Sequence, residues 1–288
     1  MELEIIIPVR NNTGSIFRLL ATLARQLKPL NAHGVAVRVG ICDDCSDDET
    51  PDALARWIGD RAELGESWWR LVRRDSWSCC GGARNTLLDS SRADWVMFAD
   101  ADDDFEDGAL EKIYFKCYHA DKVDCIIYGF RKIEKDGEKV WLPTFEDKTK
   151  DYALAPVGVW IKAVRREVVG RFAEGVFCED CAWWFELADR LDRVETIEEA
   201  LYIYDRRASS FSEAIASFQH NPKTLEDLAF NDTLVKAGMS DRAPSDSLRN
   251  LAALYDLRRK LKRPWVRCAL LNRLHHDYLS ILSGRWSF

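Results

Sequence analysis

The strongest constraint on the fold is a regular alternation of short apolar runs and helical patterns over the first 130 residues. Strands are predicted at residues 3–9, 35–42, 70–73, 95–98 and 123–128, and helices at 15–27, 50–58, 82–90 and 108–118. Because strands and helices alternate, we expect an α/β fold with a mostly parallel sheet that is flanked by helices on both faces.

The pattern changes after residue 130. The dipeptide Asp136-Gly137 favours a tight hairpin turn between Ile133 and Trp141. From about residue 225 the chain is predicted to be helical, with Pro244 and Pro264 as boundaries between helices.

Charge and cysteine content narrow the class of protein. A net charge of −7 argues against nucleic-acid binding. The apolar run at the amino terminus is too short for a secretory signal or a membrane span, so we expect a cytoplasmic protein. Nine cysteines in such a chain favour free thiols. Alternatively, Cys42 with Cys45 and Cys178 with Cys181 have the spacing of zinc ligands.

Carboxylates are crowded directly after the fourth predicted strand, where α/β proteins commonly keep their chemistry. In extended chain, Asp100 and Asp102 point the same way while Ala101 faces elsewhere. Two such oxygen donors suit Mg²⁺ or Mn²⁺ held together with phosphate oxygens. The alternatives are a solvated loop, or Asp103 and Asp104 as caps of the next helix.

Polar residues also follow the first two strands. Asp43 and Asp44 are placed to accept hydrogen bonds from a base N–H or from ribose hydroxyls. Ser46, Asp47 and Asp48 are more simply interpreted as caps of the following helix. The first strand ends in a short run that is expected to form a rim of the same site: Pro8, Val9, Arg10 and Asn11.

Two further segments carry candidate chemistry. Gly81 and Gly82 at a helix start, followed by Arg84, favour diphosphate binding, the alternative being a tight loop with a surface arginine. Glu179 and Asp180 precede an aromatic-rich helix. A carboxylate there either caps the helix or takes a proton from a sugar hydroxyl.

The aromatic helix and a later loop complete the set. Adjacent helical positions point about 100° apart, so of Trp183 and Trp184 we expect one in the core and one toward an acceptor. Arg206, Ser209 and Ser210 are candidates to donate hydrogen bonds to phosphate, the alternative being an ordinary charged loop.

Taken in order, these motifs resemble family 2 inverting glycosyltransferases of the GT-A fold over residues 3–212. The resemblance implies that Asp44, together with Asp43, contacts uracil or another base, and that the run 8–11 borders it. Cys45 stands where the family usually has glycine or asparagine in this turn.

The same resemblance implies roles for the other motifs. Asp100 would approach ribose or sugar hydroxyls, and Asp102 would ligate Mn²⁺ or Mg²⁺. Arg84 belongs to a segment near the donor, and Asp180 would be the general base. The implied reaction moves a hexosyl group from a nucleotide sugar, a UDP-sugar in the first instance, to a hydroxyl of a glycan or lipid-linked acceptor, as in polysaccharide biosynthesis.

Three regions follow from this division. Residues 1–105 are expected to form a nucleotide-binding half, residues 106–215 an acceptor half, and residues 216–288 a helical extension. Basic and apolar residues are interleaved from Arg249 onward. Such a segment either packs against the main domain or a second subunit, as in a homodimer, or makes peripheral contact with the inner face of a membrane.

Two rival functions stay open at this point. A sugar nucleotidyltransferase would need a glycine-rich signature with arginine and lysine near the first strand, and the run 8–11 stands in its place. A non-catalytic zinc or interaction protein with the GT-A fold would bind stoichiometric zinc through its cysteines.

Overall fold

The computed structural model describes residues 1–60, 68–147, 149–175, 179–206, 257, 260–264 and 266–270. Within them, nine strands form one mixed sheet in the order β3-β2-β1-β4-β8-β6-β9-β5, with β7 paired to β6.

The first half of the sheet is parallel, as expected. Residues 3–9 are all buried, which fits an apolar central strand covered on both faces. The pairs β1·β2, β1·β4 and β2·β3 are parallel. The elements are β1 (Glu2–Val9), α1 (Ser15–Ala32), β2 (Ala36–Asp43), α2 (Thr50–Gly59), β3 (Trp69–Arg73), α3 (Cys79–Ser90) and β4 (Trp95–Phe98).

The second half is mixed. Strand β8 is antiparallel to both β4 and β6, whereas β6 and β9 are parallel. The predicted hairpin is confirmed, since Glu134 pairs with Gly137. The elements are β5 (Asp104–Phe105), α4 (Ala109–His119), β6 (Cys125–Glu134), β7 (Gly137–Trp141), the 3₁₀ helices η3 (Asp151–Leu154) and η4 (Val159–Ile161), β8 (Lys162–Arg165), α5 (Glu179–Ala188) and β9 (Val194–Asp205).

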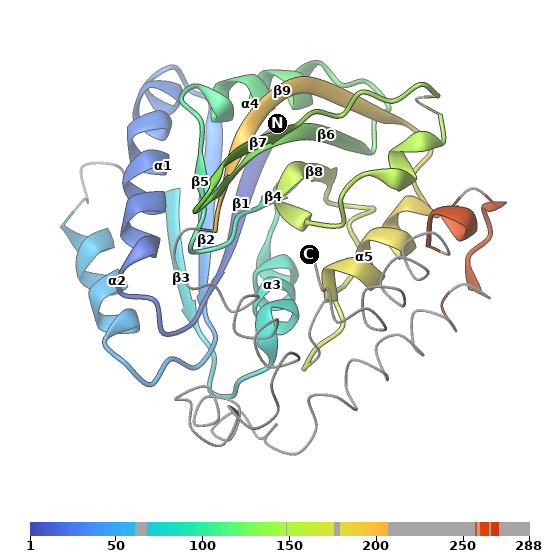
Figure 1. The fold of residues 1–288 in the computed structure, drawn as a ribbon. Coiled ribbons are helices and arrows are strands. Elements are labelled where there is room, and N and C mark those ends of the chain that lie inside the picture. Colours follow the sequence, from blue (N-terminus) through green and yellow to red (C-terminus); the bar gives the residue numbers. More distant parts are fainter. Residues whose placement is uncertain are drawn as a thin grey trace.

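Helices cover both faces of the sheet (Figure 1). Helices α1 and α4 pack against each other, and α3 packs against β1, β2 and α5. Along α1 the buried residues follow the three-to-four-residue spacing of one helix face, which directs that face onto the sheet. The carboxyl ends of β2 and β4 lie near α3 and the start of α5, because Asp44 contacts Ser78 and Arg84 on α3 contacts both Asp100 and Glu179.

A short described part of the carboxyl-terminal region packs on the main domain. Its apolar residues Leu257, Leu261, Val266, Ala269 and Leu270 belong to the buried core. The Asp189 carboxylate accepts hydrogen bonds from the backbone N–H groups of Lys262 and Arg263 at 2.7–3.0 Å. A helix then begins at Pro264, so that predicted boundary is confirmed, while Pro244 lies outside the described residues.

Two general expectations concern all of the described residues. None of the described helices combines the length and the apolar character that a membrane crossing requires. The described cysteines are free thiols.

Candidate active site

The acidic turn after β4 is tied to β9. The hydroxyl of Tyr202 donates to Asp103 Oδ2 at 2.8 Å and accepts the backbone N–H of Asp100 at 3.0 Å. Asp103 Oδ1 accepts the backbone N–H of Asp205 at 3.0 Å. Asp103 is therefore a bracing residue, and the alternative that Asp103 and Asp104 cap the next helix is wrong, because α4 begins only at Ala109.

A second brace comes from α1. Arg18 Nη2 donates to the backbone carbonyl of Asp102 at 2.7 Å, and Arg18 Nη1 lies 3.2 Å from the Asp205 carboxylate. The guanidinium also lies 3.6 Å from Asp104. Helix α1 and strand β9, which are far apart in the sequence, thus fix the backbone of the acidic turn.

The Asp102 side chain is left available by these contacts. Among the described residues, no other residue donates a hydrogen bond to its carboxylate. Burial and the charge of Asp100 raise the pKa of Asp102 to about 6. A divalent cation would relieve both effects, so the donor set fits Mn²⁺ or Mg²⁺. No cluster of three or more His, Cys, Asp or Glu side chains in the described ranges is arranged to hold a metal, so a bound molecule would have to supply further oxygens.

Arg84 joins the acidic turn to α5. Its Nη2 lies 2.7 Å from Asp100 Oδ1, and its Nη1 donates to the Glu179 carboxylate. Although burial opposes the charge, Asp100 and Glu179 raise the pKa of Arg84. The guanidinium carbon lies 5.4 Å from the centroid of the Phe172 ring. Arg84 is 3% exposed, so the alternative of a surface arginine is wrong.

The glycines before Arg84 have a packing role. A Cβ on Gly81 would overlap the carbonyl oxygen of Ala173, and a Cβ on Gly82 would overlap the Ser78 side chain. The close approach of α3 to the chain at residues 172–174 therefore accounts for Gly81, and the Ser78 side chain accounts for Gly82, whether or not a diphosphate binds nearby.

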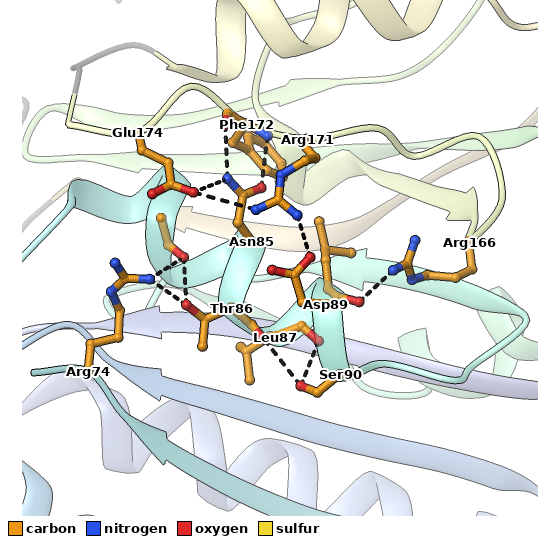
Figure 2. A network of polar contacts seen from close by, with 12 residues as sticks. Arg74, Asn85, Thr86, Leu87, Asp89, Ser90, Arg166, Arg171, Phe172 and Glu174 are labelled. Atoms are coloured by element: carbon orange, nitrogen blue, oxygen red, sulfur yellow. Dashed lines mark hydrogen bonds and ion pairs between the residues drawn. The ribbon is translucent and has the colours of Figure 1, made fainter.

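Asn85 holds that approach together (Figure 2). Its Nδ2 donates to the carbonyl of Phe172 and to Glu174 at 2.9 Å each, and its Oδ1 accepts the N–H of Phe172 at 2.9 Å. Arg171 pairs with both Asp89 and Glu174. This network fixes the segment before α5 to the side of α3.

The two acids at the start of α5 have different partners. Glu179 binds Arg84, whereas Asp180 Oδ1 accepts the backbone N–H of Cys181 at 2.8 Å. Burial raises the pKa of both carboxyls, and the charge of Arg84 opposes that rise. Asp180 is consequently the member of the pair that no arginine binds in the described structure.

The ends of β1 and β2 meet beside α3. Asp44 accepts the backbone N–H of Ser78 at 3.2 Å and lies 3.2 Å from Arg74 Nε. Burial raises the pKa of Asp44. Arg10 lies over the Trp77 ring at 5.5 Å, and its charge reaches Asp44. Of the predicted rim, Pro8 and Val9 are buried in β1, while Arg10 and Asn11 lie beyond its end.

The turn after β2 is closed by Asp43. Its carboxylate accepts the Ser46 hydroxyl and the Ser46 N–H, and Arg73 Nε lies 3.5 Å away. Cys45 has a φ of +62°, so the turn keeps a left-handed residue although cysteine stands there.

The predicted helix caps after this turn are partly wrong. Ser46 accepts the N–H of Asn11, and Asp47 binds the Asn11 side chain, so both residues brace the first loop. Only Asp48 bonds to the start of α2, where it accepts the Thr50 N–H at 2.9 Å.

The expected division of the two tryptophans is also wrong. Trp183 is 2% exposed and Trp184 is 0% exposed. Trp183 Nε1 donates to the Val169 carbonyl at 2.9 Å, and its ring stacks on Phe172 at 4.9 Å. Both rings are buried because α5 is covered on two sides, by the chain around residue 172 and by Lys162.

The predicted phosphate donors are described only in part. Arg206 lies 5.8 Å from the centroid of the Tyr204 ring, whose hydroxyl pKa burial raises to about 12. Ser209 and Ser210 lie outside the described residues, as does Cys178 of the possible zinc ligands. Burial raises the pKa of Cys42 to about 12, which disfavours the thiolate that zinc needs.

Three residues of this arrangement were not found from the sequence. Arg18 stands inside a predicted helix, Lys162 in a run for which no element was predicted, and Tyr202 in a tyrosine-rich run that resembles a strand of the family but suggested no role for Tyr202 itself. A charged residue within an apolar run, as at Lys162, was the one available signal.

Comparisons with known proteins agree with this geometry. The family profile described as glycosyl transferase family 2 matches residues 4–183. Succinoglycan biosynthesis protein ExoO of Rhizobium meliloti (strain 1021) is 28% identical over 112 residues, which are 39% of this chain. The chain matches only 28% of the length of that relative.

Solved structures share the fold. Residues 1–349 of TarS from S. aureus, in complex with UDP-GlcNAc, are 15% identical with a TM-score of 0.58, covering 100% of this chain and 93% of that one. The mannosyltransferase PcManGT from Pyrobaculum calidifontis, in complex with GDP-Man and Mn²⁺, is 19% identical with a TM-score of 0.56, covering 97% and 80%. The α/β GT-A architecture expected from the sequence is thereby confirmed.

Proposed function

This chain belongs to glycosyl transferase family 2, and from that premise we propose that it is a metal-dependent, inverting hexosyltransferase. The donor is a nucleotide sugar, with UDP-sugars as the first candidates. The acceptor is a hydroxyl of a glycan or lipid-linked molecule in polysaccharide biosynthesis. TarS and PcManGT, whose structures carry UDP-GlcNAc and GDP-Man, support the class of donor.

One observation carries the proposal. Arg84 is bonded to Asp100 in the acidic turn and to Glu179 at the start of α5. Two separate acidic motifs therefore face one buried cation, although Asp102 and Asp180 are 78 positions apart in the chain. A site that binds a diphosphate on one side and activates a hydroxyl on the other requires this juxtaposition.

Each group has a role in a single displacement. Asp180 takes the proton of the acceptor hydroxyl as the oxygen attacks the anomeric carbon. The bond from that carbon to the diphosphate breaks, and the nucleoside diphosphate leaves from the opposite face, so the anomeric configuration inverts. Mn²⁺ or Mg²⁺, held by Asp102, would offset the charge of the leaving diphosphate.

The remaining predicted residues define the edges of the donor site. Asp44 and Arg10 are assigned to the base, which would stack there or donate an N–H to the Asp44 carboxylate. Asp100, which is held by Arg84 yet partly exposed, is assigned to ribose or sugar hydroxyls, and its exposure supports this role. Arg206, with Ser209 and Ser210, is assigned to the diphosphate side.

The proposal extends to the location of the enzyme. We assign the basic residues from Arg249 onward to contact with an anionic surface such as the inner face of a membrane. The packing of Leu261 and Val266 in the core supports a docked segment whose apolar side faces the domain.

Thermal unfolding with a panel of sugar nucleotides tests the function. A donor at 100 times its Kd with Mn²⁺ should add about 2.7 kcal/mol to the free energy of unfolding. Asp102→Ala should lose the Mn²⁺-dependent part, and Asp136→Ala, in the exposed hairpin, serves as the control. Product anomers assigned by NMR then test inversion. No stabilisation by any sugar nucleotide, with or without metal, would contradict the proposal.

A further inference from the structure

A lysine is buried beneath α5. Lys162, the first residue of β8, is 0% exposed. Its Nζ donates to the carbonyls of Pro156 and Gly158 at 2.6 and 2.7 Å, and lies 4.3 Å from the centroid of the Trp184 ring. Two carbonyl dipoles and an aromatic face replace water around the ammonium, although burial lowers its pKa to about 7.

The position of this lysine connects it with the acid pair. Trp184 follows Asp180 by four residues on α5, so both lie on the same face of the helix. The charges of Lys162 and Asp180 act on each other: Lys162 lowers the pKa of Asp180, and Asp180 raises that of Lys162. The other ionisable groups facing Asp180 are Arg84, Asp100 and Glu179, and Cys125 faces Lys162.

The segment before Lys162 also contacts the acidic turn. Trp160 stacks on Tyr202 at 4.8 Å with an interplanar angle of 11°. Tyr202 in turn bonds to Asp100 and Asp103. Residues 156–162 thus contact two parts of the candidate site. Lys162 contacts Trp184 on the helix that carries Asp180, and Trp160 contacts Tyr202, which braces the acidic turn.

We propose that Lys162 is a positioning residue for Asp180. Its ammonium, fixed by the two carbonyls and by Trp184, favours the ionised carboxylate that accepts the proton and holds α5 against β8. This inference rests on the proposed function, because it takes Asp180 as the general base.

Lys162→Met tests the inference, since methionine nearly fills the same space without the charge. The acid limb of the kcat–pH profile should rise by about one pH unit, giving a loss of roughly tenfold at low pH. The KM of the donor should change by less than about twofold, because Lys162 does not reach the donor side. Above about pH 8 the two profiles should converge, because Lys162 of the wild type then loses its proton as well.

Lys116→Met is the matched control. Lys116 on α4 pairs with Glu195, at the opposite end of β9 from the residues that brace the acidic turn, and its replacement should leave the profile unchanged. Equal acid limbs for wild type and Lys162→Met, or a loss of kcat that is the same at every pH, would overturn the inference.

A second variant covers the case in which Lys162→Met does not fold. Trp184→Phe keeps an apolar ring in α5 but weakens the cation–π contact, so a smaller rise of the acid limb is expected, and an unchanged limb would overturn the inference. If the wild type turns over no sugar nucleotide at all, the proposed function fails instead, which separates the two conclusions.

Discussion

At the scale of single residues, Asp180 sets the pH at which the proposed reaction runs. A general base must be ionised, so activity is lost as the pH falls through its pKa. Burial raises that pKa, while Arg84 and Lys162 oppose the rise. Activity should therefore decline at a higher pH than the value of about 3.9 that an exposed aspartate would impose.

Asp180→Asn should lower kcat by on the order of 10²–10⁴-fold, because the amide cannot take the proton of the hydroxyl. Donor affinity should stay within about twofold, since the proposed role of Asp180 is to act on the acceptor hydroxyl. Steady-state kinetics and calorimetry measure the two effects. Asp136→Asn, in an exposed turn that tolerates asparagine, is the control. Turnover at the wild-type rate would remove Asp180 from its role.

Tyr202→Phe should destabilise the protein by about 1–3 kcal/mol, because it removes the hydrogen-bond partner of Oδ2 of the buried Asp103 and that of the Asp100 N–H. Tyr128→Phe is a matched control: the Tyr128 hydroxyl is also buried but has no hydrogen-bond partner in the described structure. Its removal should be neutral or stabilising. Chemical denaturation measures both changes, and equal effects would show that the hydroxyl of Tyr202 contributes nothing specific.

At the scale of elements, the apolar pattern of the sequence predicted those strands whose burial depends on their own residues. The strands β1 and β4 are apolar runs that parallel pairing buries on both faces, so their sequence indicated their class. The place of β8 between β4 and β6 was not predicted. It has four residues and pairs across long sequence separations, which periodicity does not encode.

The candidate site divides in the same way. Acidic clusters at strand ends were visible in the sequence, because carboxylates after an apolar strand are conspicuous. The sequence did not show which carboxylate braces the acidic turn and which stays available to a ligand. Adjacent side chains such as Asp102 and Asp103 differ only in their tertiary partners. Likewise, Trp183 is buried against Phe172, and Trp184 is buried against Lys162. Neither partner is adjacent in sequence to the ring that it covers.

The contact between α3 and the chain before α5 predicts a consequence for Gly81→Ala. The added methyl would overlap the Ala173 carbonyl and crowd Glu179, so we expect a loss of about 1–3 kcal/mol in stability together with reduced kcat. Gly59→Ala, in the last turn of α2 with open space around it, should instead be neutral or stabilise by up to about 1 kcal/mol. Thermal unfolding and kinetics on both variants check this, and equal stabilities would contradict the packing role of Gly81.

At the scale of the whole molecule, charge is unevenly distributed. The net charge is −7, yet the charged residues from Arg249 onward are mostly arginine and lysine, with Asp256 and Asp277 as the acids among them. In its described part, Lys260, Lys262 and Arg267 are exposed while Leu261 and Val266 are buried. A segment docked by its apolar residues leaves its cations outward, where they contribute to surface attraction instead of to the core.

Anionic vesicles therefore provide a direct measurement. Each cation near a charged membrane surface contributes about 1 kcal/mol, so the double variant Lys260→Gln and Lys262→Gln should weaken partitioning by roughly thirtyfold at low salt. Lys112→Gln with Lys116→Gln on α4 makes the same change in net charge elsewhere and should have little effect. Binding should also fall as salt shortens the range of the attraction. If both pairs weaken binding equally, or the wild type does not sediment with the vesicles, the cations of the carboxyl-terminal region do not form a membrane-contact face.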